Sequence, residues 1–162
     1  SAKRAFEKAA KVAQAAGTKV AVTLSDSECV KRHHADFARL VRDHVDIVFA
    51  NEREVKALTG KDDFNAAAKA LGAQCETAVL TQGSKGATII HKGKSCKIAP
   101  VKPEKLVDTT GAGDAFAAGV LYGLSEGMTP ERSGELGAKA ASKTISHVGA
   151  RSPGVKFADF LK

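Results

Sequence analysis

The residues from Asp108 to Asp114 read DTTGAGD and carry the strongest chemical signal in the sequence. An apolar stripe at helical spacing, Phe116, Val120 and Leu124, follows directly, so this segment stands at a predicted helix start. Two glycines and an alanine there leave backbone N–H groups unobstructed at the positive end of the helix dipole, which suits a phosphate. A carboxylate in the first turn can orient a hydroxyl and accept its proton. The alternative for Asp114 is structural, a carboxylate that merely favours the dipole.

Two other phosphate-binding motifs are excluded. The sequence has no G-x-x-x-x-G-K-[ST] string, which a Walker loop needs. A dinucleotide fingerprint needs a third small residue where Phe116 stands.

Polar or glycine-rich segments follow three short apolar runs, at Ser25-Asp26, at residues 51–54 and at residues 81–86. In open parallel sheets, ligands bind beyond the carboxyl ends of the strands. Asn51 and Glu54 also have the spacing of a capping box, so a helix-start role and a ligand role both stay open. Residues 81–86 are likewise either a strand-end turn or a ligand contact.

The elements that must position these residues alternate between strands and helices. We expect a helix over 2–16, a strand over 19–24, a helix opened by a capping box of Ser25 and Glu28, and a strand over 45–50. Helices over 51–60 and 63–72 and a strand over 77–81 follow, a pattern typical of right-handed crossovers in a parallel sheet. A hairpin over 87–91 and 95–99 and helices over 111–126 and 130–147 complete one α/β domain over residues 1–162.

Composition excludes several classes of protein. The net charge is +7, but the basic residues are scattered and aromatics are only 5%, so nucleic-acid binding is not expected. No apolar run approaches the roughly 18 residues that cross a bilayer, so we expect a cytoplasmic protein with no membrane partner. The three cysteines form no CxxC pair, and we expect them to be buried and reduced.

The string DTTGAGDAFAAG resembles the C-terminal signature of the ribokinase, or PfkB, family of carbohydrate and nucleoside kinases. Upstream, NERE at 51–54 resembles the family's NxxE motif, and LTQGSKG at 80–86 resembles its T-x-G-x-x-G turn. The resemblance spans essentially the whole chain. It implies a ribokinase-like α/β fold: a mainly parallel sheet with helices on both faces and a C-terminal β-hairpin. The family's first glycine signature and lid strands have no counterpart, so the lid and N-terminal half are absent and we expect a fragment of a longer chain.

The resemblance also implies a role for each matching residue. Asp114 corresponds to the catalytic base, and the backbone of Gly111, Ala112 and Gly113 to the anion hole. The implied ATP contacts are Thr81, Gly83, Ser84, Gly86, Thr110, Gly111 and Gly113. Asn51 and Glu54 correspond to the magnesium–phosphate water network, and Asp108 and Thr110 to a monovalent-cation (K⁺) site of some members. Residues 147–152 resemble the adenine-pocket loop, although His147 equally suits a helix end.

The function implied is ATP- and Mg²⁺-dependent phosphoryl transfer to a hydroxyl of a nucleoside or sugar. Overall similarity favours the bacterial adenosine-kinase-like branch, and therefore adenosine as the acceptor in the full-length enzyme. The alternatives are a ribokinase- or fructokinase-type sugar kinase, or a non-catalytic nucleotide-binding fragment in the form given. We expect this chain alone to be inactive and the full-length form to be a candidate homodimer.

Overall fold

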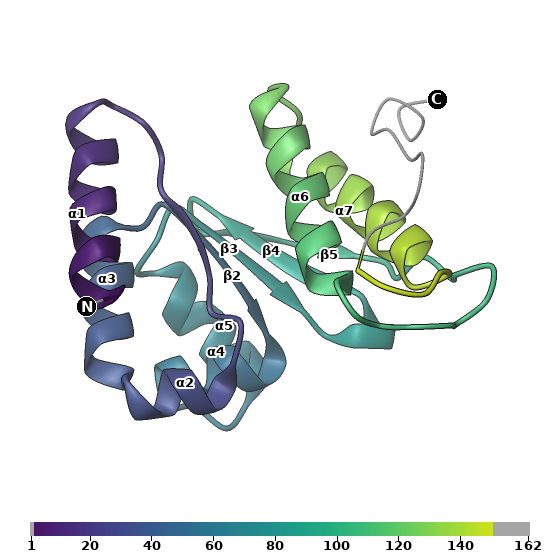
Figure 1. The fold of residues 1–162 in the computed structure, drawn as a ribbon, viewed down its shortest axis with the longest axis horizontal. Coiled ribbons are helices and arrows are strands. Elements are labelled where there is room, and N and C mark those ends of the chain that lie inside the picture. The colour runs from purple at the N-terminus through teal and green to yellow at the C-terminus, as the bar shows by residue number, and fades with distance from the viewer. Residues whose placement is uncertain (1, 151–162) are drawn as a thin grey trace. The chain divides into compact units, whose positions relative to one another are not determined.

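The computed structural model describes residues 2–150, which form two compact units. Unit 1 comprises residues up to Thr81 together with residues 90–95, and unit 2 comprises residues 82–89 and the described residues from 96 onward. The elements in chain order (Figure 1) are α1 (Ala2–Ala15), β1 (Ala21–Thr23), α2 (Ser27–Arg32), α3 (His34–His44), β2 (Ile47–Asn51), α4 (Glu52–Thr59), α5 (Phe64–Gly72), β3 (Thr77–Thr81), a 3₁₀ turn (Gly83–Lys85), β4 (Ala87–His91), β5 (Lys94–Ile98), α6 (Ala112–Ser125) and α7 (Pro130–Thr144).

The five strands form one sheet in the order β1-β2-β3-β4-β5, and the first three strands are parallel. Val48 of β2 pairs with Val22 of β1 on one side and with Ala78 of β3 on the other. The connections from β1 to β2 and from β2 to β3 both move the chain one strand in the same direction across the sheet. Because such connections are right-handed, they place α2 to α5 on the same face of the sheet. The core confirms this arrangement, since Val48 and Leu80 pack with buried residues of all four helices.

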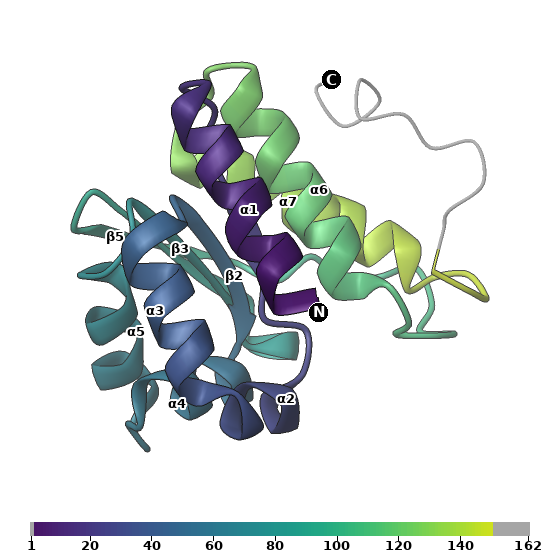
Figure 2. The ribbon, with the colours of Figure 1, turned by 60° about the vertical axis from the view of Figure 1, so that its left-hand side comes forward.

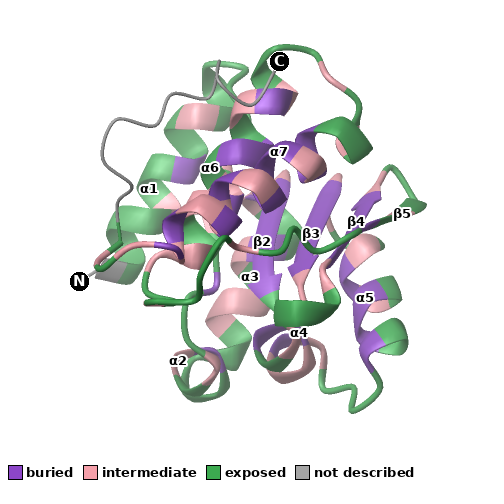
Figure 3. Cartoon of the chain, turned by 90° about the vertical axis from the view of Figure 1, so that its right-hand side faces the viewer, coloured by how far each residue is buried: buried purple, intermediate pink, exposed green. Residues whose placement is uncertain are grey.

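Both faces of β2 and β3 are buried. Val48, Ala50, Ala78 and Leu80 belong to the core cluster of unit 1, while Ile47, Phe49, Thr77 and Val79, which point the other way, are at most 7% exposed. Figure 3 shows these two strands as buried along most of their length. Continuous burial rather than alternation is characteristic of parallel strands covered on both sides, so the predicted α/β class is confirmed.

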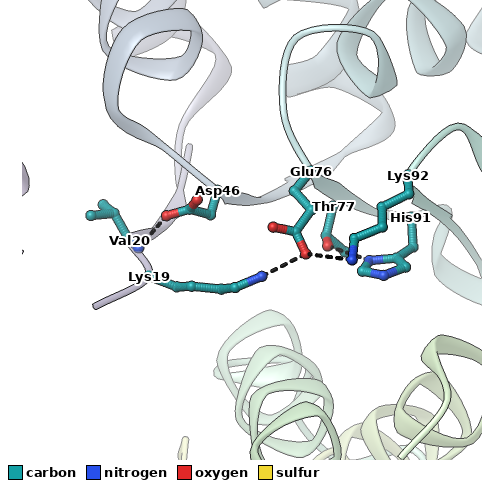
Figure 4. A network of polar contacts seen from close by, with 7 residues as sticks. All are labelled: Lys19, Val20, Asp46, Glu76, Thr77, His91 and Lys92. Atoms are coloured by element: carbon teal, nitrogen blue, oxygen red, sulfur yellow. Dashed lines mark hydrogen bonds and ion pairs between the residues drawn. The ribbon is translucent and has the colours of Figure 1, made fainter. Parts of the chain in front are cut away.

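The amino ends of the parallel strands are tied together by polar contacts (Figure 4). Asp46 accepts a hydrogen bond from the Val20 amide at 2.7 Å. The Glu76 carboxylate accepts from the Lys19 ammonium at 2.5 Å and lies 3.8 Å from the Lys92 ammonium. Lys92 also begins the hairpin turn that follows β4. Its positive φ of 49°, followed by 77° at Gly93, gives the two-residue turn that matches strand twist.

The helix α1 lies along α3 through surface ion pairs (Figure 2). Arg39 of α3 donates to Glu7 of α1 at 2.7 Å, and Lys3 of α1 pairs with Asp36 of α3. These pairs are partly exposed, so they fix the place of α1 more than they add to stability.

In unit 2, α6 and α7 pack through small residues that bring their backbones close together. A Cβ added at Gly119 would lie 2.6 Å from the Gly137 Cα atom, and one added at Gly123 would lie 2.6 Å from the Ser133 hydroxyl. The helix α7 begins at Pro130, as predicted, with Thr129 as its N-cap. The helix start at Ala112 therefore stands on a tightly packed helix pair.

Three local expectations were wrong. Asp26, not Ser25, caps α2, since its carboxylate accepts from the Glu28 amide, whereas Ser25 precedes the cap with a φ of 61°. The helix expected after Ser25 is two helices, because the chain turns at His33. The cysteines are free but half-buried rather than buried. In the described part of the chain, no helix is long and apolar enough to span a membrane.

Candidate functional site

The start of α6 presents backbone amides that have no acceptor within the described part of the chain. Gly111 is the N-cap with φ of 79°, and the Ala112 amide donates to the Thr109 carbonyl at 3.2 Å. Among residues 2–150, the amides of Gly111, Gly113 and Asp114 have no hydrogen-bond acceptor, since the first N–H groups of a helix have no partner within the helix. A Cβ added at Gly113 would meet no described atom within 4 Å. This helix start can therefore receive an anion, with the exposed Asp114 carboxylate beside it.

The Asp108 carboxylate joins the loop before α6 to the loop after α7. One carboxylate oxygen accepts from the Thr110 amide at 2.9 Å, and the other accepts from the Gly149 amide at 2.9 Å. A hydrogen bond from the Thr110 side chain first, and then these two amide hydrogen bonds, lower the pKa of the Asp108 carboxyl below its ordinary value. Of the residues expected at a cation site, Asp108 and Thr110 are thus brought together within one turn.

Asn51 and Glu54 form a reciprocal cap at the start of α4. The Glu54 carboxylate accepts from the Asn51 amide at 2.9 Å and from its side-chain nitrogen at 2.7 Å, and the Asn51 side-chain oxygen accepts from the Glu54 amide at 3.0 Å. Glu54 is only 5% exposed, and this burial raises the pKa of its carboxyl. The Asn51 hydrogen bond lowers the pKa in part, and the negative charge of Asp26 raises it further. The capping-box interpretation is confirmed.

The turn after β3 holds the remaining expected ATP contacts. Thr81 ends β3, and Gly83 and Ser84 are exposed in the short 3₁₀ turn. Gly86 has a structural requirement of its own, since a Cβ there would lie 2.1 Å from the Ile98 carbonyl oxygen. The strand register pairs Thr81 with Asn51. Within unit 1, therefore, one residue expected at ATP and one expected in the magnesium network lie on neighbouring strand ends.

Each expected site residue belongs to one of the two units. Unit 1 holds Asn51, Glu54 and Thr81. Unit 2 holds Gly83, Ser84, Gly86, Asp108, Thr110, Gly111, Ala112, Gly113 and Asp114.

Two residues that act on the expected site residues had no assigned role. Asp26 was expected only as part of a polar strand end, and it follows β1 as Asn51 ends β2. Gly149 lies 41 residues from Asp108, and no local pattern points to it.

The donor groups can be tested for their fit to magnesium. Both Glu54 oxygens are already occupied by Asn51, and the described residues contain no group of three or more acidic, histidine or cysteine side chains that could hold a metal ion. Direct coordination by several protein ligands does not fit these residues. A contact of Glu54 to the water shell of a phosphate-bound cation does fit, because Mg²⁺ usually keeps several waters.

Comparisons with known proteins match the chain to one family and to several kinases. The pfkB family carbohydrate kinase pattern matches residues 1–156. A cytidine kinase of Thermococcus kodakarensis is 39% identical over 125 residues, covering 75% of this chain and 44% of that protein. The adenosine kinase structure from Sinorhizobium meliloti matches at a TM-score of 0.91 with 39% identity, over 97% of this chain and 48% of that one.

A structure of a probable sugar kinase from Rhizobium etli matches at a TM-score of 0.92 with 39% identity, over 98% of this chain and 48% of that one. The chain thus spans about half the length of these relatives. The described fold is accordingly the ribokinase-like α/β fold. On the family match over nearly its whole length, the chain belongs to the pfkB family of carbohydrate kinases.

Proposed function

We propose that this chain is the ATP-binding and catalytic part of a longer kinase that transfers the γ-phosphoryl group of ATP to a hydroxyl of a small molecule. The observation that carries the proposal is the start of α6, where the amides of Gly113 and Asp114, which have no acceptor among the described residues, stand beside the Asp114 carboxylate. The family membership and the half-length match to kinases support it.

The amide pair supplies the anion-binding function. Phosphoryl transfer places negative charge on the equatorial oxygens of the transferring group, and fixed N–H donors there need no reorganisation during the reaction. Gly113 leaves space for a phosphate oxygen to approach, because it has no side chain and no described neighbour within 4 Å of its Cβ position. In this proposal the γ-phosphoryl group lies against these two amides.

Asp114 supplies the base. An exposed carboxylate one residue after Gly113 can accept the proton of an acceptor hydroxyl while that oxygen attacks phosphorus. When bound with ATP, Mg²⁺ neutralises phosphate charge. Glu54 and Asn51 would hold its water shell, and K⁺ near Asp108 and Thr110 is a further candidate ligand.

We propose a nucleoside, adenosine first, as the acceptor of the longer protein. Two of the similar proteins are named as a cytidine kinase and an adenosine kinase. The probable sugar kinase favours a second candidate, a free sugar such as ribose or fructose. The same proposal implies that this chain alone binds ATP but does not turn over, because it would position ATP without positioning the acceptor. Positioning of two reactants can contribute about 7–11 kcal/mol to such a reaction.

The test has a binding part and a turnover part. Mg-ATP is titrated into the protein while the Gly113 amide is followed by NMR, and a shift that saturates at millimolar nucleotide or below is expected. An unmoved Gly113 resonance at millimolar Mg-ATP contradicts the site. ADP release is then measured for the longest natural form of the protein with adenosine, cytidine, ribose and fructose. A preference for a free sugar overturns the acceptor proposed. Turnover by the 162-residue chain overturns the proposal that this chain alone binds ATP without phosphorylating an acceptor.

A further inference from the structure

The loop before α6 and the loop after α7 are held together at three points in unit 2. At the first point, the Val107 and Asp108 amides both donate to the Ile145 carbonyl, at 2.9 and 3.3 Å. The Asp108 carboxylate accepts from the Gly149 amide at 2.9 Å. Gly111 approaches Ala150 so closely that an added Cβ would lie 2.7 Å from the Ala150 Cα atom and carbonyl oxygen. The three contacts follow the same order along both segments, so one loop cannot shift without the other.

Asp108 is the central contact because its side chain serves both loops at once. Its first oxygen closes the turn onto the Thr110 amide, one residue before the Gly111 N-cap, and its second oxygen reaches Gly149. The two amides donate to two different oxygen atoms, and among the side chains of this size only a carboxylate carries two oxygens. Asparagine would turn an N–H₂ group toward one of the two donors.

We infer that Asp108 is a positioning residue that sets the place of the anion-binding amides through the loop after α7. The inference rests on the proposed function, since it concerns the amides to which we assign the phosphate. The chain of contact is short: Asp108 fixes Thr110, Gly111 follows, and the amides of Gly113 and Asp114 come in the next turn. Through Gly149, the conformation of residues 145–150 bears on the same amides.

This role differs from that of a simple cation ligand in its consequences. A ligand that contributes one oxygen to K⁺ keeps that oxygen in Asp108→Asn, and more K⁺ then compensates for weaker binding. A positioning carboxylate loses one of its two acceptors in Asp108→Asn and both in Asp108→Ala, and K⁺ restores neither. Displacing a catalytic constellation by about 1 Å can cost about 10²-fold in rate.

The first measurement is hydrogen exchange of the Gly149 amide in the ligand-free protein. Asp108→Ala is compared with Asp36→Asn, which changes another aspartate of lowered pKa that pairs with Lys3 in unit 1. We expect at least about tenfold faster exchange at Gly149 in Asp108→Ala alone, since the acceptor is lost. An unchanged exchange rate overturns the inference. A thermal scan of each variant identifies one that is unfolded, and Asp108→Asn, nearly isosteric, then takes the place of the alanine variant.

The second measurement is turnover of the longest natural form with Mg-ATP at several K⁺ concentrations. Both Asp108 variants should lose about 10²-fold in kcat with less than about tenfold change in the KM for ATP, at every K⁺ concentration. Recovery of Asp108→Asn by K⁺, or kcat within twofold of the wild type, overturns the inference. If the wild type itself shows no Gly113 shift with Mg-ATP, the proposed function fails. This failure can be told apart from a failure of the inference about Asp108, because Gly149 exchange is measured without nucleotide.

Discussion

Gly111 and Gly113 stand two residues apart at the start of α6, yet the structure predicts opposite consequences for the same substitution. In Gly113→Ala, the new methyl group meets no described atom within 4 Å, and Gly113 lies inside α6. Alanine is favoured over glycine in helices by about 0.5–1 kcal/mol, so stability should stay unchanged or rise by up to about 1 kcal/mol. Nucleotide binding should nevertheless fall.

The loss of binding follows from the direction of the methyl group. A Cα–Cβ bond in a helix tilts toward the N-terminus, which is the side from which a phosphate approaches the Gly113 amide. If the phosphate loses one hydrogen bond of the charged kind, the cost is about 1.5–3 kcal/mol. That corresponds to about 10- to 150-fold weaker ATP binding.

Gly111→Ala is the matched variant, and it should lower the stability of the protein. Its φ of 79° costs an alanine about 1–2 kcal/mol, and the approach of 2.7 Å to the Ala150 backbone adds about 1–3 kcal/mol of overpacking. The sum, about 2–5 kcal/mol, should lower the Tm by several degrees.

Thermal unfolding and Mg-ATP titration by calorimetry on both variants check the pair. Wild-type ATP affinity in Gly113→Ala at an unchanged Tm would refute the phosphate position. A Tm loss as large in Gly113→Ala as in Gly111→Ala would refute the packing argument.

Two further predictions concern the base and the strand ends. Asp114→Asn should lower kcat of the longest natural form by about 10²- to 10⁴-fold while the KM for ATP changes little. Steady-state kinetics measures both constants. Near-normal turnover would remove Asp114 from the mechanism. The Lys19 hydrogen bond, with the charges of Lys19, Lys92 and His91, lowers the pKa of the Glu76 carboxyl. The ionised Glu76 therefore stabilises the folded protein fully above the ordinary glutamate pKa, and this stabilisation is lost as pH falls through the lowered value. Glu76→Gln should therefore cost about 0.2–1 kcal/mol at pH 7 in urea unfolding, with a difference that shrinks below about pH 4; an equal difference at pH 3 would contradict this assignment.

Local patterns predicted the elements and helix starts well where the deciding contacts are a few residues apart. The Asn51–Glu54 cap and the Thr129-Pro130 start involve neighbours within one turn, and both are present. The Ser25 cap was wrong because Ser25 and Asp26 are both good caps in sequence. The tight turn in which the Asp26 amide donates to the Leu24 carbonyl at 2.7 Å decides between them.

Features that depend on distant segments could not be predicted. The Asp108–Gly149 contact joins residues 41 apart. The requirement for glycine at position 86 arises from the Ile98 carbonyl at the end of another strand. Even within the DTTGAGD motif, the sequence does not reveal that the Ala112 amide is taken by Thr109, while the amides of Gly111, Gly113 and Asp114 have no acceptor among residues 2–150. The motif predicts the kind of chemistry, and the loops around it decide which atoms are available.

The glycine contacts between α6 and α7 also bear on the order in which the chain folds. These two helices are joined by the short turn at residues 126–129, so their contacts close a small loop and cost little chain entropy. Each parallel pairing of β1 with β2, or β2 with β3, must instead wait for a crossover of two helices. Because local contacts form faster than distant ones, the helix pair should assemble early in folding. The helix start at Gly111 to Asp114 would then be in place before the parallel sheet is complete.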